Sequence, residues 1–93
     1  MYNFSMKIAI VTGASSGMGR DFARYLDSFL GLDEIWVVAR RRERLEELEK
    51  ELKTKVRILP LDITSEESIK AIEKNLEEEK PNVQYLVNAA GFG

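Results

Sequence analysis

The chain has 93 residues, of which 44% are hydrophobic and 32% charged, and its formal net charge is −2 at pH 7. These values are typical of one small globular domain and give no general attraction to nucleic acid or to an anionic membrane. Because the sequence has no cysteine and no histidine, disulfides and the commonest transition-metal ligands are excluded. With no run long enough to span a bilayer and no secretory apolar region, we expect a cytoplasmic protein without a metal site.

The first half of the chain alternates strand and helix patterns. Apolar runs over 8–11 and 35–39 predict two strands that are buried on both faces. Between them, residues 17–30 predict an amphipathic helix, and residues 42–53 predict a second one. The apolar stripe expected on the first helix consists of Met18, Phe22, Leu26, Phe29 and Leu30, and that on the second of Leu45, Leu48 and Leu52. Phe22, Phe29 and Trp36 are expected in the core.

The second half of the chain continues the same alternation. Residues 56–61 predict a strand, and Pro60, which lacks an N–H donor, suits the edge of a sheet. Thr64 and Glu67 are spaced as a capping box and predict that a helix starts there. A fourth apolar run at 83–87 predicts another strand. The β-α-β-α-β-α-β order predicts an α/β fold, a partial Rossmann-like doubly wound parallel sheet with strand order 3-2-1-4.

A glycine-rich turn joins the first strand to the first helix. Its glycines have the spacing Gly-x-x-x-Gly-x-Gly, and the backbone amides at a helix start, together with the helix dipole, attract phosphate. We therefore predict that this turn holds the pyrophosphate of a dinucleotide. The alternative is a glycine-rich turn with no ligand. The residues expected to take part are Gly13, Ser15, Ser16, Gly17, Met18 and Gly19.

The end of the second strand predicts which dinucleotide binds. Ala39 stands where a carboxylate would bind the ribose hydroxyls of NAD, and three arginines follow it. Arg40 first, and Arg41 next, can bind a 2′-phosphate, which favours NADP over NAD. The alternative is that these arginines are solvated charges, although cations at a helix N-terminus oppose the dipole. The helix from Glu43 onward is expected to be surface.

Two short runs resemble the signatures of one known family. The run from Thr12 to Gly19 closely resembles the cofactor signature of the short-chain dehydrogenase/reductase family. The run Asn88, Ala89, Ala90 and Gly91 resembles its second signature, Asn-Asn-Ala-Gly, with Ala89 replacing the second asparagine. The resemblance extends from about Met6 to Gly91. It implies that Asn88 ties neighbouring loops together and that the backbone of 89–91 contacts the cofactor.

The resemblance also assigns a role to the residues after the third strand. It implies that Asp62 lies against the adenine amino group and that the N–H of Ile63 faces a ring nitrogen of the adenine. From the residues alone, Asp62 has an alternative role as a turn former that helps Thr64 to start a helix.

The catalytic residues of the family are not found in these 93 residues. The resemblance implies a tyrosine with a lysine four positions later, but the tyrosines here are followed at that spacing by Met6, Phe29 and Ala89. We therefore expect residues 1–93 to be the N-terminal dinucleotide-binding part of an NADP(H)-dependent oxidoreductase, inactive by itself. In the full-length protein the substrate would be a small carbonyl or alcohol compound. The alternatives are a non-enzymatic nucleotide-binding or regulatory module, or a folding fragment.

The position and the apolar sequence of the fourth strand suggest how this chain contacts other copies of itself. In the order 3-2-1-4 it forms an open edge with unpaired backbone groups, and the run 83–87 is apolar and uncharged. We therefore expect a homo-oligomer, or self-association, through this strand.

Overall fold

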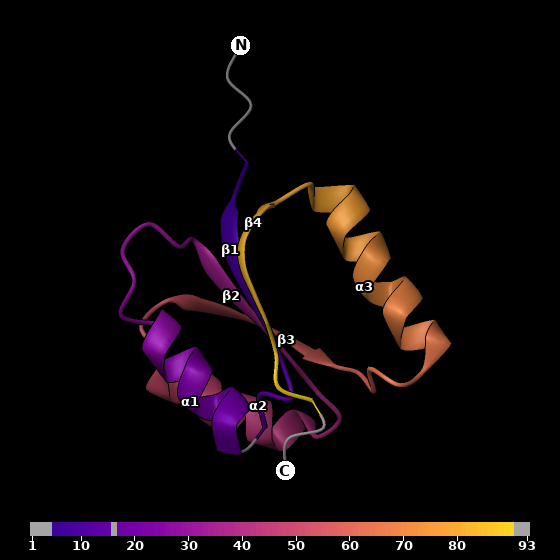
Figure 1. Cartoon of the computed structure of the whole chain (residues 1–93), viewed down its shortest axis with the longest axis horizontal. Coiled ribbons are helices and arrows are strands. Elements are labelled where there is room, and N and C mark those ends of the chain that lie inside the picture. The colour runs from indigo at the N-terminus through magenta and orange to yellow at the C-terminus, as the bar shows by residue number, and fades with distance from the viewer. Residues whose placement is uncertain (1–4, 16, 91–93) are drawn as a thin grey trace.

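The computed structural model describes residues 5–15 and 17–90 (Figure 1). In chain order the elements are β1 (Lys7–Thr12), α1 (Gly17–Leu26), β2 (Glu34–Ala39), α2 (Arg42–Glu51), β3 (Lys55–Pro60), α3 (Glu66–Glu79) and β4 (Asn82–Asn88). All neighbouring strands pair in parallel, in the order β3-β2-β1-β4. The predicted fold class and strand order are confirmed, and Pro60 lies on the edge strand β3 as expected.

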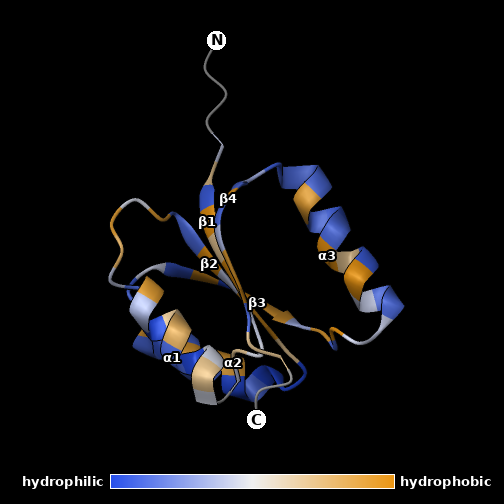
Figure 2. Ribbon diagram, viewed as in Figure 1, coloured by the Kyte–Doolittle hydropathy of each residue, from blue (hydrophilic) through white to orange (hydrophobic). Residues whose placement is uncertain are grey.

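The helices cover the two faces of the sheet unequally. Helices α1 and α2 lie on one face and α3 lies alone on the other (Figure 1). Figure 2 shows the corresponding pattern: the helices alternate between hydrophobic and hydrophilic residues, whereas the inner strands are mostly hydrophobic. Every residue of β2 is buried, because this strand has a neighbour on each side and is covered on both faces.

Alternating side chains of the inner strands build two separate cores. On the side of α1 and α2 the buried residues include Ala9, Val11, Ala23, Leu26, Ile35, Val37, Leu45 and Leu48. On the side of α3 they are Ile8, Ile10, Trp36, Val38 and Leu59, against which Ile72 and Leu76 pack. The expected core position of Trp36 is confirmed, since its side chain is fully buried.

The first helix is shorter than predicted. It ends at Leu26 rather than at residue 30, because Ser28 donates its hydroxyl to the Tyr25 carbonyl (2.6 Å) and the following bonds are of the tighter i→i+3 type. Leu26 is buried and Phe29 packs against the core, as expected. The rest of the predicted stripe is wrong, because Met18 and Phe22 lie on the solvent side of α1 and Leu30 lies beyond its end. The exposed fractions of Met18, Phe22 and Leu30 are 49%, 38% and 100%.

The other two helices also differ from the prediction at their ends. Helix α2 stops at Glu51 rather than at residue 53, and Leu52 after it is extended. The predicted capping box of α3 is wrong, because Ser65, not Thr64, is the N-cap and accepts a hydrogen bond from the Ser68 N–H (3.4 Å). Thr64 is instead bound to the preceding Asp62, which competes for its backbone and hydroxyl groups.

A buried carboxylate, which sequence reasoning missed, joins β2, β3 and α3. The side chain of Glu34 is 5% exposed, accepts a hydrogen bond from Trp36 Nε1 (2.9 Å) and lies 3.3 Å from the guanidinium of Arg57. The same guanidinium stacks over the Trp36 ring, 4.6 Å from its centroid, and pairs with Glu79 at the end of α3. Because no residue of α3 is fully buried, this polar link is a major attachment of the helix to the sheet.

The carboxylate of Asp27 fixes the end of α1 to the turn before β3. It accepts hydrogen bonds from the N–H groups of Lys53 (3.0 Å) and Thr54 (2.8 Å). Partial burial acts to raise the pKa of Asp27, but the hydrogen bonds from Thr54 and Lys53 outweigh it and hold the pKa below the ordinary value of 3.8. The charged form is therefore the one that stabilises the fold.

We expect Asp27→Asn to lower the free energy of unfolding by about 1–2 kcal/mol at neutral pH, because an amide offers one acceptor oxygen in place of two. A lowered folded-state pKa stabilises the fold above the unfolded pKa, and this contribution is lost as the pH falls through the folded value. The difference from the parent chain should therefore shrink in acid. Urea unfolding of both chains at neutral pH and in acid measures this difference in the free energy of unfolding. The control is Asp21→Asn, which removes an exposed carboxylate paired only with Arg24 on the same helix. An equal loss in both variants would contradict the assignment.

Candidate functional site

The carboxyl ends of the four parallel strands meet at one edge of the sheet. In parallel α/β sheets, ligands bind in the crevice outside these ends. Here they are followed by the turn at 13–15, by the arginines after β2, by Asp62 after β3 and by Ala89 and Ala90 after β4. The predicted site residues that the structure describes are therefore at the same edge. Ser16 and Gly91 lie outside the described residues.

The turn between β1 and α1 is packed backbone against backbone. Gly13 has a φ of 68°, and a Cβ on it would lie 2.7 Å from Ala89 C and Ala90 N. A Cβ on Gly19 would overlap the carbonyl group of Gly13. Both positions therefore require glycine, one against the loop after β4 and one against the first turn of α1. The glycine spacing of this turn thus goes with close backbone packing at two of its three glycines.

Side-chain and backbone hydrogen bonds hold the same turn in place. Thr12 Oγ1 donates to Asn88 Oδ1 (2.6 Å), and the Ala89 N–H donates to the Thr12 carbonyl (3.1 Å). On the other side, the Ala14 N–H donates to the Val38 carbonyl (3.2 Å). The turn is thus tied to β4 and β2 at once, and Asn88 takes part by linking the end of β4 to the end of β1.

The start of α1 faces open space. Gly17 has a φ of 57°, and no atom of the described residues lies within 4 Å of the position that its Cβ would take. The N–H groups of Gly17, Met18 and Gly19 belong to the first turn of a helix and have no partner inside it. No acidic residue lies in this turn to offset the positive end of the helix dipole. An anion at this place would meet favourable charge and no steric obstacle.

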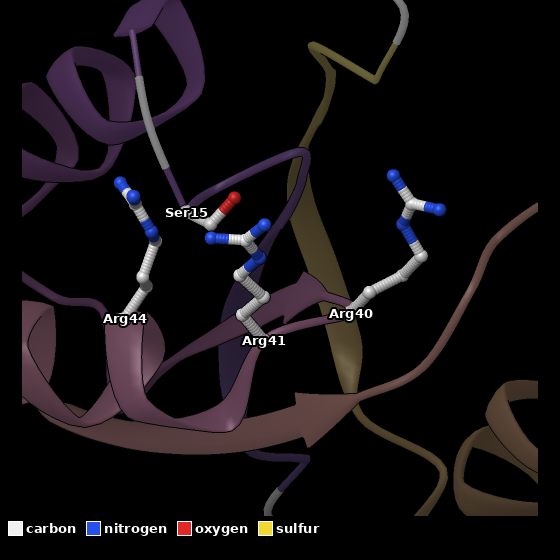
Figure 3. A pocket seen from close by; sticks show the side chains of 4 residues that line it. All are labelled: Ser15, Arg40, Arg41 and Arg44. Atoms are coloured by element: carbon white, nitrogen blue, oxygen red, sulfur yellow. The ribbon is translucent and has the colours of Figure 1, made fainter.

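Arginines line a pocket next to this turn. Ser15, Arg40, Arg41 and Arg44 surround a volume of about 260 Å³ (Figure 3). Figure 3 shows the Arg41 guanidinium beside the Ser15 hydroxyl, Arg44 extending from α2 on the same side, and Arg40 extending on the other side of Arg41. The pocket therefore has a predominantly cationic wall, with a hydroxyl from the glycine-rich turn as a further donor.

Arg44 was missed by the sequence analysis, which treated α2 from Glu43 onward as surface. The signal was present in the spacing: Arg41 is the N-cap of α2, and Arg44 follows three residues later in the first turn of the helix, close to that cap.

Asp62 takes the turn-forming role that was one of its two expected functions. Its Oδ1 accepts hydrogen bonds from the N–H (2.9 Å) and the hydroxyl (2.6 Å) of Thr64. The hydroxyl bond and then the N–H bond hold the pKa of Asp62 below its ordinary value, and the nearby positive charge of Arg40 acts in the same direction. The carboxylate is thus held charged next to Arg40. Contact of Asp62 or Ile63 with adenine stays a prediction.

The described residues hold no second site of a familiar kind. No group of three or more potential metal ligands gathers among residues 5–15 and 17–90. Within the same ranges, no helix has the length and apolar character needed to cross a membrane. The rings of Tyr25 and Tyr85 each pack edge-to-face on Phe29, with centroids 5.0 Å and 5.1 Å away.

The chain is similar to known proteins both in sequence and in structure. An NADP-dependent 3-hydroxy acid dehydrogenase from Schizosaccharomyces pombe is 36% identical over 92% of this chain and 34% of its own length. L-sorbose reductase from Gluconobacter frateurii, solved with NADPH and L-sorbose, has a TM-score of 0.77 and 30% identity, over 96% of this chain and 35% of that one. A short-chain dehydrogenase from Sphingobium yanoikuyae in complex with NADPH has a TM-score of 0.70 and 30% identity, over 86% and 32%.

These matches agree with the site geometry, although the chain spans only about a third of the length of each of the three proteins. The family model for short chain dehydrogenases matches residues 7–93. This range holds the glycine-rich turn, the arginine pocket and the loop after β4. The chain therefore belongs to the short-chain dehydrogenase family of oxidoreductases.

Proposed function

We propose that residues 1–93 form the N-terminal dinucleotide-binding part of an NADP(H)-dependent oxidoreductase that interconverts a carbonyl and an alcohol in a small molecule. The observation that carries the proposal is that the glycine-rich turn and the arginine pocket adjoin each other through Ser15. The protein can thus bind a diphosphate and a further phosphate that belong to the same ligand. The relatives named above, two of them solved with NADPH, support the same cofactor.

The pyrophosphate would be held by the start of α1. Main-chain amides of Gly17, Met18 and Gly19 supply donors and partial positive charge, and Ser15 adds a hydroxyl. Backbone packing of Gly13 and Gly19 fixes these groups before any ligand arrives, so binding costs little local ordering. The loop at Ala89 and Ala90 lies against the same turn and would face the next part of the cofactor.

The extra phosphate of NADP would be held in the arginine pocket. Guanidinium groups bind phosphate with charge-assisted, often bidentate hydrogen bonds, and no carboxylate lines this pocket to repel a dianion. Arg41 and Ser15 lie between Arg44 and Arg40 and would make the central contacts (Figure 3). The charge of Arg40 acts on Asp62, which is expected to lie against the adenine. Arg40 would therefore offset the negative charge of the phosphate from the side where the adenine binds.

The chemistry would be hydride transfer, which the nicotinamide of the bound cofactor supplies. The residues of this chain would bind the phosphates of the cofactor, and they include no tyrosine followed four positions later by lysine. We therefore propose that these 93 residues bind the cofactor and do not by themselves turn over a substrate. We also propose a cytoplasmic location, which the lack of cysteine favours because secreted domains often carry disulfides.

We expect NADPH to bind the chain at least about tenfold more tightly than NADH, because the added phosphate gains charge-assisted hydrogen bonds. Arg40→Ala, Arg41→Ala and Arg44→Ala should each weaken NADPH binding and reduce this preference while leaving NADH binding unchanged. Calorimetric titration with both nucleotides measures the effect. The matched control is Arg42→Ala, because Arg42 is exposed on the same helix and does not line the pocket. Equal affinities of the parent chain for NADPH and NADH would refute the phosphate pocket.

A pair of glycine variants tests the pyrophosphate site. Gly17 and Gly31 both have positive φ, 57° and 92°, and in both cases an added Cβ meets no described atom within 4 Å. Alanine at either position should therefore cost about 1 kcal/mol of stability through backbone strain. Only Gly17→Ala should also weaken NADPH and NADH binding, since only this methyl group would enter the phosphate space. Thermal unfolding and the same titration separate the two effects. Parallel binding losses in both variants would contradict the site.

A further inference from the structure

Charged side chains join α1 to α2. The guanidinium of Arg20, at the end of the first turn of α1, lies 3.7 Å from a carboxylate oxygen of Glu47 and 3.7 Å from one of Glu51. One turn later, Arg24 donates hydrogen bonds to both carboxylate oxygens of Glu51 (3.0 Å and 3.3 Å). Two carboxylates of α2 are therefore paired with arginines of α1.

Arg20 is the most enclosed member of this group. Its side chain is 18% exposed, compared with 46% for Arg24 and 64% for Glu47. Its Nε is buried and has no hydrogen-bond partner among the described residues. The distances to Glu47 and Glu51 are too long for hydrogen bonds, so Arg20 acts on these carboxylates through its charge. Because an unpaired buried donor costs stability, the position of Arg20 is not explained by stability alone.

Glu47 lies next to the arginine pocket on the surface of α2. Arg44, which lines the pocket, and Glu47 are three residues apart in this helix, so their side chains are neighbours and within reach of an ion pair. Among the described residues, however, Glu47 pairs with Arg20 and not with Arg44. A Glu47 carboxylate turned toward Arg44 would occupy the donors of that guanidinium and would repel a phosphate dianion.

We propose that Arg20 is a positioning residue for the choice of cofactor: it holds Glu47 away from Arg44 and so keeps Arg44 available for the extra phosphate of NADP. The inference rests on the proposed function, because it deepens the role of the arginine pocket. Arg20 itself does not touch the phosphate and acts only through Glu47. Its effect is therefore confined to NADP, since NAD carries no phosphate in this pocket.

Calorimetric titration with NADPH and NADH tests the proposal, with the ratio of the two affinities as the readout. Arg20→Met keeps an unbranched apolar stem but removes the charge, so Glu47 can turn to Arg44. The ratio should fall about two- to fivefold, the range of an exposed ion pair, while the affinity for NADH stays the same. Arg20→Lys, which keeps the charge, should retain the ratio of the parent chain.

Two double variants separate this role from a general effect on the structure. In Arg20→Met/Glu47→Gln the competing carboxylate is absent, so the ratio should return to that of the parent chain. In an Arg44→Ala background, Arg20→Met should no longer change the ratio, because the group that Glu47 would block has been removed. Thermal unfolding reports the stability of each variant, and Arg20→Gln takes the place of Arg20→Met if the latter does not fold.

The matched control for the lost charge is Arg24→Met. It removes the same charge from α1, at a residue that pairs with Glu51 and, among the described residues, not with Glu47. This variant should keep the ratio of the parent chain. An equal fall in Arg24→Met and Arg20→Met would show a general effect of positive charge on α1 and would overturn the proposal.

The matched control for the rescue is Glu46→Gln, combined with Arg20→Met. Glu46 is a carboxylate adjacent to Glu47 on α2, but it is two residues from Arg44 and does not face it. Its replacement should not restore the ratio. A rescue as complete as that by Glu47→Gln would trace the effect to net charge and would overturn the proposal.

The same titrations distinguish a failure of this inference from a failure of the proposed function. A parent chain that binds NADPH and NADH equally, or binds neither, overturns the phosphate pocket and this inference together. A preference for NADPH that depends on Arg44 but is unchanged by Arg20→Met overturns this inference alone. So does a loss that Glu47→Gln fails to rescue, or a parallel loss of affinity for both nucleotides.

Discussion

The site depends on one steric constraint, the contact of bare backbone with bare backbone at the turn between β1 and α1. Gly13 leaves no room for a Cβ against the Ala89 and Ala90 backbone, and Gly19 leaves none against Gly13. These two glycines let the turn after β1 pack closely against the start of α1 and against the distant loop at 89–90, at the carboxyl edge of the sheet. Hydrogen bonds from Thr12 to Asn88 and from Ala14 to Val38 keep it there. The groups that we propose for phosphate binding are either part of this turn or lie next to it.

The electrostatics of the site follow from where this turn lies. The N-terminal ends of α1 and α2 both point toward the same strand ends, and α1 has no acidic residue in its first turn. Arginines at the start of α2 are in an unfavourable place for a helix alone, since cations oppose the dipole at that end. A phosphate in the pocket would make this charge arrangement favourable, because the helix dipole and the guanidinium groups would both attract it. The proposed phosphate would thus offset the unfavourable position of the arginines at the start of α2.

Sequence periodicity predicted the fold well where burial was two-sided and less well at helix ends. Continuous apolar runs identified the inner strands β1 and β2, because an inner parallel strand has no polar face, and apolar runs also located the edge strands β3 and β4. The stripe from Met18 to Leu30 was misjudged because periodicity alone does not detect the early end of α1 at Leu26, which depends on Ser28 and on distant partners of Asp27. Thr64 was assigned as a cap because Asp62, two residues earlier, was not weighed as its competitor.

For the candidate site, the sequence indicated the residues of the turn and of the strand end, but not those that come close only through helix geometry or tertiary contacts. The glycine spacing indicates the backbone contacts directly, since only a residue without a Cβ fits them. The arginine pocket was predicted from Arg40 and Arg41, but Arg44 enters through helix geometry that residue-by-residue reading of a strand end does not consider. The buried Glu34 could not be foreseen, because its partners Lys55 and Arg57 are more than 20 residues away in a strand of mixed polarity.

The parts of the fold differ in how many buried contacts hold them in place. Around the turn between β1 and α1, contacts are between backbones and the nearby core residues are fully buried. Helix α3 has no fully buried residue and depends on half-buried Ile72 and Leu76 and on the ion pair of Arg57 with Glu79. Local opening starts where buried apolar contacts are fewest, so it should begin at α3 and leave the opposite face of the sheet intact. Since both proposed phosphate sites are built from α1, α2 and the strand ends, motion of α3 should leave their geometry unchanged.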